Sequence, residues 1–200
     1  MSRFDKVAKE WDISDARTAL SENIAKTLID NVSLQTTMNI IDFGAGTGLL
    51  TSHMLGRVAS VAAVDISAGM LKQLAQKEEL KDMVTPYCQN IIHEPLEDDF
   101  DGIISAMTLH HVKNTDEILK VFYEHLKEGG FLALADLDKE DGSFHSHGNE
   151  GVFHFGFERE ALHVKLIDAG FKEIKFTTAY TIDKGEGKTF PIFLVTALKV

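Results

Sequence analysis

The sequence predicts an α/β fold in which a doubly wound, mostly parallel sheet carries helices on both faces. The first observation is an alternation of element types, because apolar runs of strand length are separated by segments with helical spacing. The second is a glycine-rich turn at 44–48, directly after the first apolar run. The third is Asp65, which ends the second run. Strands that alternate with helices form parallel sheets covered on both sides.

Five apolar runs predict the strands of the first two thirds of the chain. Each has the length of a buried strand, and segments with helical spacing separate them. They cover residues 38–43, 60–65, 84–88, 102–106 and 131–136.

Helices are expected around these runs, the first over residues 15–30. In two later segments, apolar residues recur at helical spacing and would share one face: Ile118, Val121, Phe122 and Leu126 in the first, and Leu162, Leu166 and Ala169 in the second. Such faces are the surfaces with which helices cover a sheet.

The last third of the chain breaks this alternation. Residues 171–180 and 190–198 both have strand character, and a turn rich in glycine and lysine, 183–188, lies between them. Two successive strands without a helix predict a hairpin. Before them, residues 137–157 form one long irregular stretch with several phenylalanines, which favours a packed substrate-side loop over a linker.

The composition predicts one domain over residues 1–200, because a chain of this length can bury roughly 70% of its unfolded surface. The net charge of −11 argues against nucleic acid as a partner, since nonspecific affinity for it comes from Lys and Arg. Cys88 is the only cysteine, so no internal disulfide forms and a reducing compartment fits. Residues 1–11 lack the apolar stretch of a signal peptide, and no run approaches the roughly 18 residues of a membrane span. We therefore expect a cytoplasmic protein without a membrane partner. The sequence does not indicate the oligomeric state.

The chemistry is concentrated in residues 39–50, N-I-I-D-F-G-A-G-T-G-L-L. Gly44, Gly46 and Gly48 would form the turn from strand to helix, because glycine adopts positive φ and lets the backbone touch a ligand. Asp65 follows about twenty residues later, where a carboxylate can hold the two hydroxyls of a ribose. Together these features predict a nucleoside cofactor.

The glycine spacing limits the choice of cofactor. A dinucleotide-binding loop, G-x-G-x-x-G/A, needs a third small residue at position 49, which here is Leu49. The spacing is instead G-x-G-x-G, and the loop contains no Lys or Arg to assist a diphosphate. A NAD(P)-dependent oxidoreductase is therefore the less favoured alternative.

Four segments form an ordered set of motifs: D-F-G-A-G-T-G-L at 42–49, V-A-A-V-D-I-S-A-G-M at 61–70, F-D-G-I-I-S at 100–105 and L-K-E-G-G-F-L at 126–132. They resemble, in this order, the first motif, the second motif, the fourth strand and the turn into the fifth strand of the class I S-adenosylmethionine-dependent methyltransferases. The resemblance covers residues 38–136 and implies a Rossmann-like sheet of seven strands, the last inserted antiparallel beside the fifth.

The resemblance implies S-adenosylmethionine as the cofactor and transfer of its methyl group to a small molecule. Asp65 would hold the ribose hydroxyls through charge-assisted hydrogen bonds. Asp42 would orient the glycine loop and meet the ammonium group of the methionine portion. Ile66 and Met70 would pack on the adenine. Asn90 stands where the family commonly has an acidic residue, and its side-chain carbonyl can still accept a proton from the adenine amino group.

The other expected contacts come from backbone groups and from walls of the site. The backbone of Ile91 would read the adenine ring, and Ala106 would end the fourth strand near the reactive methyl, because ligands of open α/β sheets bind beyond the carboxyl ends of strands. Residues 1–35 would form a helical cap in which Trp11 covers the cofactor, with simple core packing of Trp11 as the alternative. The complete expected cofactor-binding set is Trp11, Asp42, Gly44, Ala45, Gly46, Gly48, Asp65, Ile66, Met70, Asn90, Ile91 and Ala106.

Methyl transfer from a sulfonium depends on positioning, and it needs a base only if the acceptor loses a proton early. His110 and His111, in M-T-L-H-H-V after the fourth strand, are the candidate catalytic residues, ahead of His145, His147 and His154 in the long loop. That loop also holds acidic residues, but their spacing defines no known metal site. A solvated lid is favoured there, and no metal is expected.

A noncatalytic module that binds S-adenosylmethionine is the other alternative, because the binding residues are clearer than the catalytic ones. The sequence leaves open the acceptor molecule and whether its reacting atom is O, N, S or C.

Overall fold

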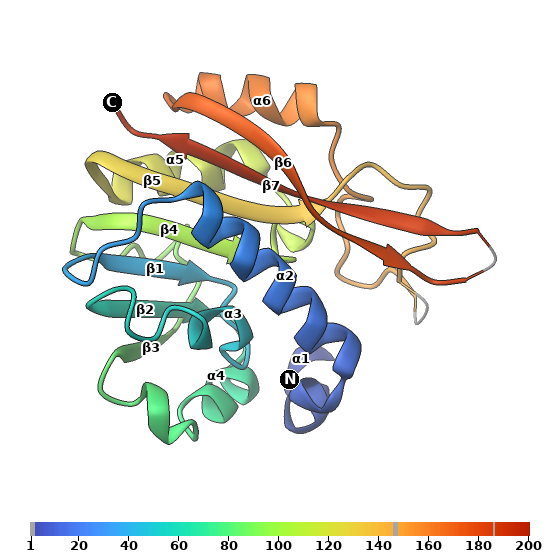
Figure 1. Cartoon of the computed structure of the whole chain (residues 1–200), viewed down its shortest axis with the longest axis horizontal. Coiled ribbons are helices and arrows are strands. Elements are labelled where there is room, and N and C mark those ends of the chain that lie inside the picture. The colour runs from blue at the N-terminus through green and yellow to red at the C-terminus, as the bar shows by residue number, and fades with distance from the viewer. Residues whose placement is uncertain (1–2, 146–147, 186) are drawn as a thin grey trace.

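Seven strands form one sheet in the computed structural model, which describes residues 3–145, 148–185 and 187–200 (Figure 1). Their order across the sheet is β3-β2-β1-β4-β5-β7-β6. β7 pairs antiparallel with β5 and with β6, whereas the other neighbouring strands pair in parallel. This arrangement confirms the expected seven-stranded, Rossmann-like sheet. The strands are β1 (Asn39–Phe43), β2 (Ser60–Asp65), β3 (Val84–Cys88), β4 (Phe100–Ala106), β5 (Leu126–Leu137), β6 (Lys172–Asp183) and β7 (Thr189–Leu198).

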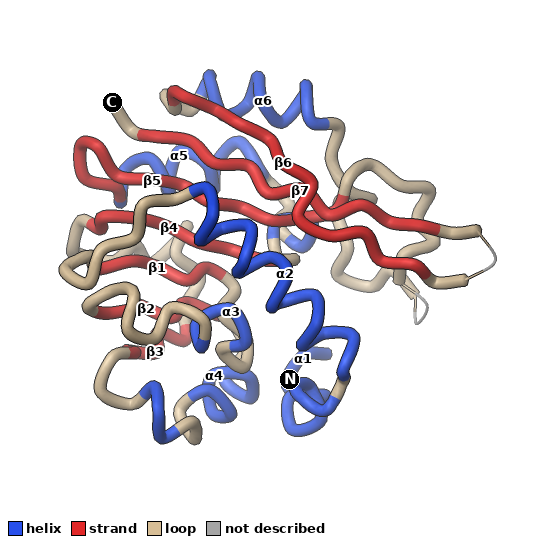
Figure 2. The backbone as a smooth tube through the Cα atoms, viewed as in Figure 1, coloured by secondary structure: helices blue, strands red, loops and turns tan. Residues whose placement is uncertain are grey.

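Helices cover both faces of this sheet (Figure 2). On one face, an apolar cluster that includes Leu28, Leu50 and Leu74 joins the sheet to α2 (Asp15–Asn31), α3 (Leu49–Ser52) and α4 (Ala68–Leu74). On the other face, a second cluster that includes Phe122 and Leu166 joins it to α5 (Thr115–His125) and α6 (Arg159–Asp168). The shorter helical segments are α1 (Arg3–Val7), η1 (Ala8–Ile13), η2 (Glu78–Leu80) and η3 (Leu109–His111).

The starts of the two longest helices follow from capping residues. The Oγ atom of Ser14 accepts a hydrogen bond from the backbone N–H of Arg17 at the start of α2 (3.4 Å). The Oδ1 atom of Asn114 accepts one from the backbone N–H of Glu117 at the start of α5 (3.3 Å). Such side chains satisfy backbone donors that have no partner inside the helix.

The fifth strand begins earlier than the sequence predicted. We expected Leu126 on the apolar face of the helix, but α5 ends at His125, and Leu126 pairs in extended conformation with Phe100 of β4. Leu126 is buried in this position. The prediction was wrong because an apolar residue four positions after Phe122 fits both a helix face and the start of a buried strand.

The expected hairpin at the end of the chain is confirmed. β6 and β7 pair along most of their length, from Lys172 opposite Leu198 to Asp183 opposite Thr189. Figure 1 shows that β6 and β7 extend past the end of β5, next to the segment that connects β5 with α6.

The carboxyl ends of the strands place the chemically informative residues at one edge of the sheet. The glycine loop follows β1, Asp65 ends β2, and η3 follows β4. β1 and β4 are neighbours, with β2 and β3 to one side and β5 to the other. The strand order therefore changes direction between β1 and β4. Open α/β sheets bind ligands in the crevice that forms at such a point, beyond the carboxyl ends of the strands. Within the described ranges, no helix is both long enough and apolar enough to cross a membrane.

Candidate functional site

A cavity of about 540 Å³ opens at the carboxyl ends of β1, β2 and β4. Most of the predicted site residues line it: Trp11, Asp42, Gly44, Ala45, Gly46, Asp65, Ile66, Met70, Asn90, Ala106 and His111. Three predicted residues have other surroundings. Gly48 precedes α3 and packs near Leu74. Ile91 is buried in the apolar cluster between the sheet and the helices α5 and α6. His110 is buried against Asp136.

The glycine loop is held in place by β2. The backbone N–H groups of Gly44 and Ala45 donate to the carbonyl oxygen of Val64, at 2.8 and 3.2 Å. Gly44 and Gly46 have positive φ values of 70° and 55°. A Cβ atom on Gly44 would lie 2.2 Å from the Oγ1 atom of Thr108, so this position has no room for a side chain. Glycine is therefore needed here for both conformation and space.

Asp65 links the glycine loop to the start of α4. Its Oδ2 atom accepts a hydrogen bond from the N–H of Gly46 (2.9 Å), and its Oδ1 atom accepts one from the N–H of Ser67 (2.8 Å). Burial raises the pKa of this carboxyl group above its ordinary value. Each carboxylate oxygen can accept a second hydrogen bond, so the side chain can still receive ribose hydroxyls from the cavity.

Asp42 is almost fully buried at the end of β1. Its Oδ2 atom accepts a hydrogen bond from the Oγ1 atom of Thr51 in α3 (2.5 Å). This bond connects the end of β1 with the helix that follows the glycine loop, and orientation of the loop by Asp42 stays a prediction. Burial raises the pKa of Asp42 to about 7, and the nearby charge of Asp65 adds to this effect. A ligand ammonium group placed here would favour the ionised carboxylate.

The wall expected to meet the adenine contains both apolar and polar side chains. Ile66 is 69% exposed, whereas Met70 is buried beneath it in α4. Both line the cavity, as does Asn90. The Oδ1 atom of Asn90 accepts a hydrogen bond from the N–H of Ile92 (3.0 Å), which leaves the side-chain NH₂ group as the available donor. Asn90 can therefore present a donor to an adenine ring nitrogen as well as the expected carbonyl acceptor.

The helical N-terminal segment lies over the cavity. Trp11 and Phe4 line it, and their rings make an edge-to-face contact at 5.8 Å between centroids. Arg17 stacks on Trp11, with its guanidinium carbon 4.0 Å from the ring centroid, and donates to the Trp11 carbonyl oxygen (3.1 Å). Phe4 also contacts His111, at 5.2 Å between centroids.

Two aspartates of this segment anchor it to the cofactor motifs. The Oδ1 atom of Asp5 accepts hydrogen bonds from the Ser67 hydroxyl (2.7 Å) and the Gly69 N–H (2.9 Å). Asp12 accepts a hydrogen bond from the hydroxyl of Thr47 in the glycine loop (2.5 Å) and forms an ion pair with Lys77 (2.9 Å). Sequence reasoning missed both anchors, because isolated carboxylates in a charged segment carry no periodic signal.

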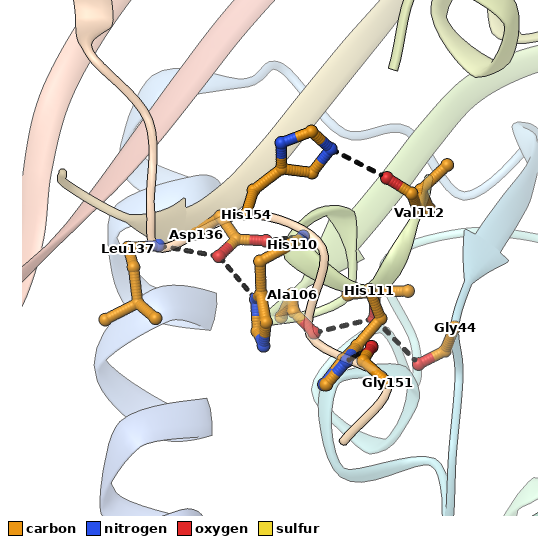
Figure 3. A network of polar contacts seen from close by, with 10 residues as sticks. Gly44, Ala106, His110, His111, Val112, Asp136, Leu137, Gly151 and His154 are labelled. Atoms are coloured by element: carbon orange, nitrogen blue, oxygen red, sulfur yellow. Dashed lines mark hydrogen bonds and ion pairs between the residues drawn. The ribbon is translucent and has the colours of Figure 1, made fainter. Parts of the chain in front are cut away.

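The candidate catalytic histidines lie beside each other at the end of β4 (Figure 3). The Nδ1 atom of His110 lies 2.7 Å from the Oδ1 atom of Asp136, and both side chains are buried. The Nδ1 atom of His111 lies 2.7 Å from the carbonyl oxygen of Gly151. Both oxygens are acceptors, so each Nδ1 carries a proton, and in the neutral His111 ring Nε2 is then the acceptor nitrogen. Of the two histidines, His111 is the one that lines the cavity.

The long loop brings further histidines to this place. The ring of His145 lies 5.2 Å from that of His110 and 5.9 Å from that of His111, between centroids. Burial, together with the neighbouring His110, lowers the pKa of both His111 and His145 to about 4, so both rings are neutral at pH 7. The backbone N–H of His154 donates to the carbonyl oxygen of His110 (3.2 Å), and its ring Nε2 donates to the carbonyl oxygen of Val112 (2.9 Å). His147 lies outside the described residues.

Comparison with known protein families shows which family has the residues that form this site. The family of proteins with a methyltransferase domain matches residues 41–134, which include most of β1, the glycine loop, Asp65, β4 and most of β5. The chain belongs to the class I S-adenosylmethionine-dependent methyltransferases.

Several curated relatives of this methyltransferase are 22–30% identical to it over the aligned residues. An uncharacterized methyltransferase from Schizosaccharomyces pombe is 28% identical over 158 residues, which are 70% of this chain and 55% of that protein. The malonyl-[acyl-carrier protein] O-methyltransferase of Priestia megaterium is 30% identical over 160 residues, 76% of this chain and 58% of that protein. The chain thus spans little more than half the length of these relatives.

Solved structures share the fold. A chain from the complex between the Haloferax volcanii Trm112 methyltransferase activator and a methyltransferase superposes with a TM-score of 0.77 at 18% identity. The match covers 100% of this chain and 98% of the other.

The residues of this methyltransferase fit the cofactor of its family. A Cβ atom on Gly46 would meet no atom closer than 4.0 Å, and Gly46 lines the cavity, so its backbone is open to a ligand. Asp65 and Asp42 would offer carboxylates to the ribose and the ammonium group, and the exposed apolar side chain of Ile66 would face the adenine. When bound there, S-adenosylmethionine supplies an activated methyl group.

Proposed function

We propose that this chain catalyses transfer of the methyl group of S-adenosylmethionine to a small molecule, with release of S-adenosylhomocysteine. The observation that carries the proposal is the cavity itself, which is lined by the glycine loop and Asp65 and also by His111 and Phe153. A cavity of about 540 Å³ is within the range of sites that enclose small ligands. The net charge of −11 supports a small acceptor over nucleic acid.

Positioning would supply most of the acceleration. The sulfonium already activates the methyl group, so the protein has to hold the acceptor atom in line with the sulfur–carbon bond. Ala106, Met107 and Thr108 line the cavity where β4 ends. Met107 has a positive φ of 56°, which is rare for a residue with a side chain and typical of functional sites. We assign to this strand end the placement of the acceptor, with His111 facing it.

The test begins with titration calorimetry of the purified chain against S-adenosylmethionine, S-adenosylhomocysteine and NADH. Binding of the two methionine-derived ligands, without NADH binding, is the expected result. Turnover is then measured with radiolabelled S-adenosylmethionine and a panel of small thiols, phenols, amines and carboxylic acids. Cofactor binding without turnover on any acceptor, including those in a small-molecule extract of cells, would favour the noncatalytic binding module. NADH binding without S-adenosylmethionine binding would overturn the proposal.

A further inference from the structure

We propose that His110, His111 and His145 form a binding site for a divalent transition-metal ion of the zinc class. Each residue offers one ring nitrogen, and the three nitrogen atoms lie within 4.8 Å of one another. Two of the residues are adjacent in η3, and the third comes from the long segment between β5 and α6. Histidine nitrogen is a preferred ligand of zinc and of the neighbouring divalent metals.

The spacing of the three nitrogen atoms is close to what an ion requires. Nitrogen ligands at 2.0–2.1 Å from a tetrahedral ion lie about 3.3 Å from one another. The present separations are within 4.8 Å, so binding needs a contraction of no more than about 1.5 Å. His145 can supply this movement because it belongs to an irregular segment, whereas His110 and His111 are fixed at the end of a strand.

Two of the three rings are already oriented as metal ligands. The Nδ1 atom of His110 donates to the buried carboxylate of Asp136, and the Nδ1 atom of His111 donates to the carbonyl oxygen of Gly151, both at 2.7 Å (Figure 3). Metal-binding histidines usually donate their second ring N–H to a carboxylate or a carbonyl, which fixes the tautomer and the ring plane. The Asp136 carboxylate is itself held by the backbone N–H groups of His110 (3.1 Å) and Leu137 (2.7 Å).

The third ring has a polar atom that the described protein groups do not satisfy. The Nδ1 atom of His145 is buried and has no hydrogen-bond partner among the described residues. Buried polar atoms are nearly always paired, and an exception calls for a ligand, a water or an ion. Phe144 packs edge-to-face on this ring at 5.0 Å between centroids, so one side of the ring is shielded from solvent.

Two acidic side chains of the same segment, Asp138 and Glu140, make contacts of their own. Asp138 forms a bidentate ion pair with Arg159, and both N–O distances are 2.7 Å. The Oε2 atom of Glu140 accepts hydrogen bonds from the N–H groups of Gly142 (2.8 Å) and Phe144 (3.0 Å), whereas its buried Oε1 atom has no hydrogen-bond partner among the described residues. Among the described residues, the group whose ligand atoms lie within 4.8 Å of one another consists of the three histidines and includes neither carboxylate. Their sequence spacing matches no known metal motif, which is why the sequence predicted no metal.

A three-histidine site leaves a coordination position open, and His111 places the site beside the cavity. Resting on the proposed function, we infer that this position takes a thiol or hydroxyl acceptor. Coordination lowers the pKa of such a group, so its proton passes to solvent. The acceptor's electron pair then forms the new bond to the methyl carbon, the sulfur–carbon bond of the sulfonium breaks, and its electron pair stays on the cofactor sulfur. In this arrangement, the ring nitrogen of His111 that could act as a general base would instead bind the ion.

The test uses the full chain without a polyhistidine tag. After treatment with a chelator, the protein is dialysed against Zn²⁺, and bound metal is measured by mass spectrometry. Co²⁺ titration followed by visible absorption reports the coordination directly. We expect one ion per chain, a cobalt spectrum typical of tetrahedral coordination, and at least a tenfold loss of affinity in His111→Ala and in His145→Ala. His163→Ala, in α6, is the matched control and should bind as the unchanged chain does.

Asp136→Asn separates a metal site from a group of packed histidines. It keeps the three rings but removes the carboxylate behind His110, and it should weaken metal binding roughly 10- to 100-fold. Equal metal binding by the unchanged chain, His111→Ala and His145→Ala would overturn the site, as would less than one ion per chain at saturation. Calorimetry with S-adenosylmethionine on the same metal-free samples tests the proposed function separately, because the residues expected to bind the cofactor do not include His145.

Discussion

Asp65 uses one carboxylate for two purposes. Its two oxygen atoms accept the N–H groups of Gly46 and Ser67, and the side chain also lines the cavity. The glycine loop and the start of α4 are therefore connected through the group expected to hold the ribose. The sequence predicted a carboxylate at the strand end but not these amide contacts, because spacing does not show which backbone donors a carboxylate meets.

Asp65→Ala should weaken S-adenosylmethionine binding by about 1.5–3 kcal/mol, the usual loss for hydrogen bonds to a charged group. Titration calorimetry measures this change. Asp101→Ala is the control, because Asp101 is also a strand-end carboxylate that accepts a backbone N–H, from Asn39 (2.7 Å), but it lies at the opposite end of β4. Equal affinities for Asp65→Ala and the unchanged chain would refute the ribose contact.

Gly46 allows a test of the loop that separates conformation from ligand contact. Gly46→Ala and Gly56→Ala both place a side chain at positive φ, 55° and 71°, and neither meets an atom closer than 4.0 Å. Both should lose roughly 1 kcal/mol of folding stability. Only Gly46→Ala should lower cofactor affinity, by at least tenfold, because Gly46 lines the cavity. Thermal unfolding and calorimetry on both variants measure these effects, and a similar affinity loss in Gly56→Ala would contradict the assignment.

At the scale of elements, the strands and long helices could be predicted, whereas the contacts between distant segments could not. The strands of the first two thirds of the chain follow from apolar runs, and the hairpin follows from two such runs with only a turn between them. The packing of α1 on α4, and of His145 beside His110, joins segments far apart in the chain. Those contacts depend on tertiary packing, which leaves no periodic pattern in either segment.

The contact between the N-terminal segment and α4 can be tested at Gly69. A Cβ atom there would lie 2.9 Å from the Cα atom of Asp5, so Gly69→Ala should displace α1. Alanine also favours the helix by roughly 1 kcal/mol, so folding stability should not fall. Cofactor affinity should drop several-fold, because Phe4 and Trp11 would no longer cover the cavity.

Hydrogen exchange provides the structural readout for this variant. Amides of residues 3–13 should exchange faster in Gly69→Ala than in the unchanged chain, and the strands should exchange at the same rate. Lys72→Ala changes an exposed position of α4 and serves as the control. Unchanged exchange over residues 3–13 would show that this segment does not depend on the contact.

For the whole molecule, buried ionisable groups give opposing dependences of stability on pH. Burial raises the pKa of Asp42 from 3.8 to about 7, so the unfolded chain binds fewer protons between these values and stability falls as pH rises. Burial lowers the pKa of His111 and His145 from 6.5 to about 4, so their contribution is present above 6.5 and is lost as pH falls toward 4. A pH profile of the unchanged chain therefore combines both slopes.

Asp42→Asn isolates one of these slopes, because asparagine keeps an acceptor for the Thr51 hydroxyl but carries no charge at any pH. In the absence of cofactor, the variant should melt roughly 5 °C or more above the unchanged chain at pH 8, where the buried carboxylate is ionised. At pH 4 the carboxyl group is protonated in the folded chain, so the two melting temperatures should agree within about 2 °C. Calorimetric scans from pH 4 to pH 8 measure this difference. A constant difference across that range would show that Asp42 does not titrate between 3.8 and about 7, and that the cost of its burial is already offset in the cofactor-free molecule.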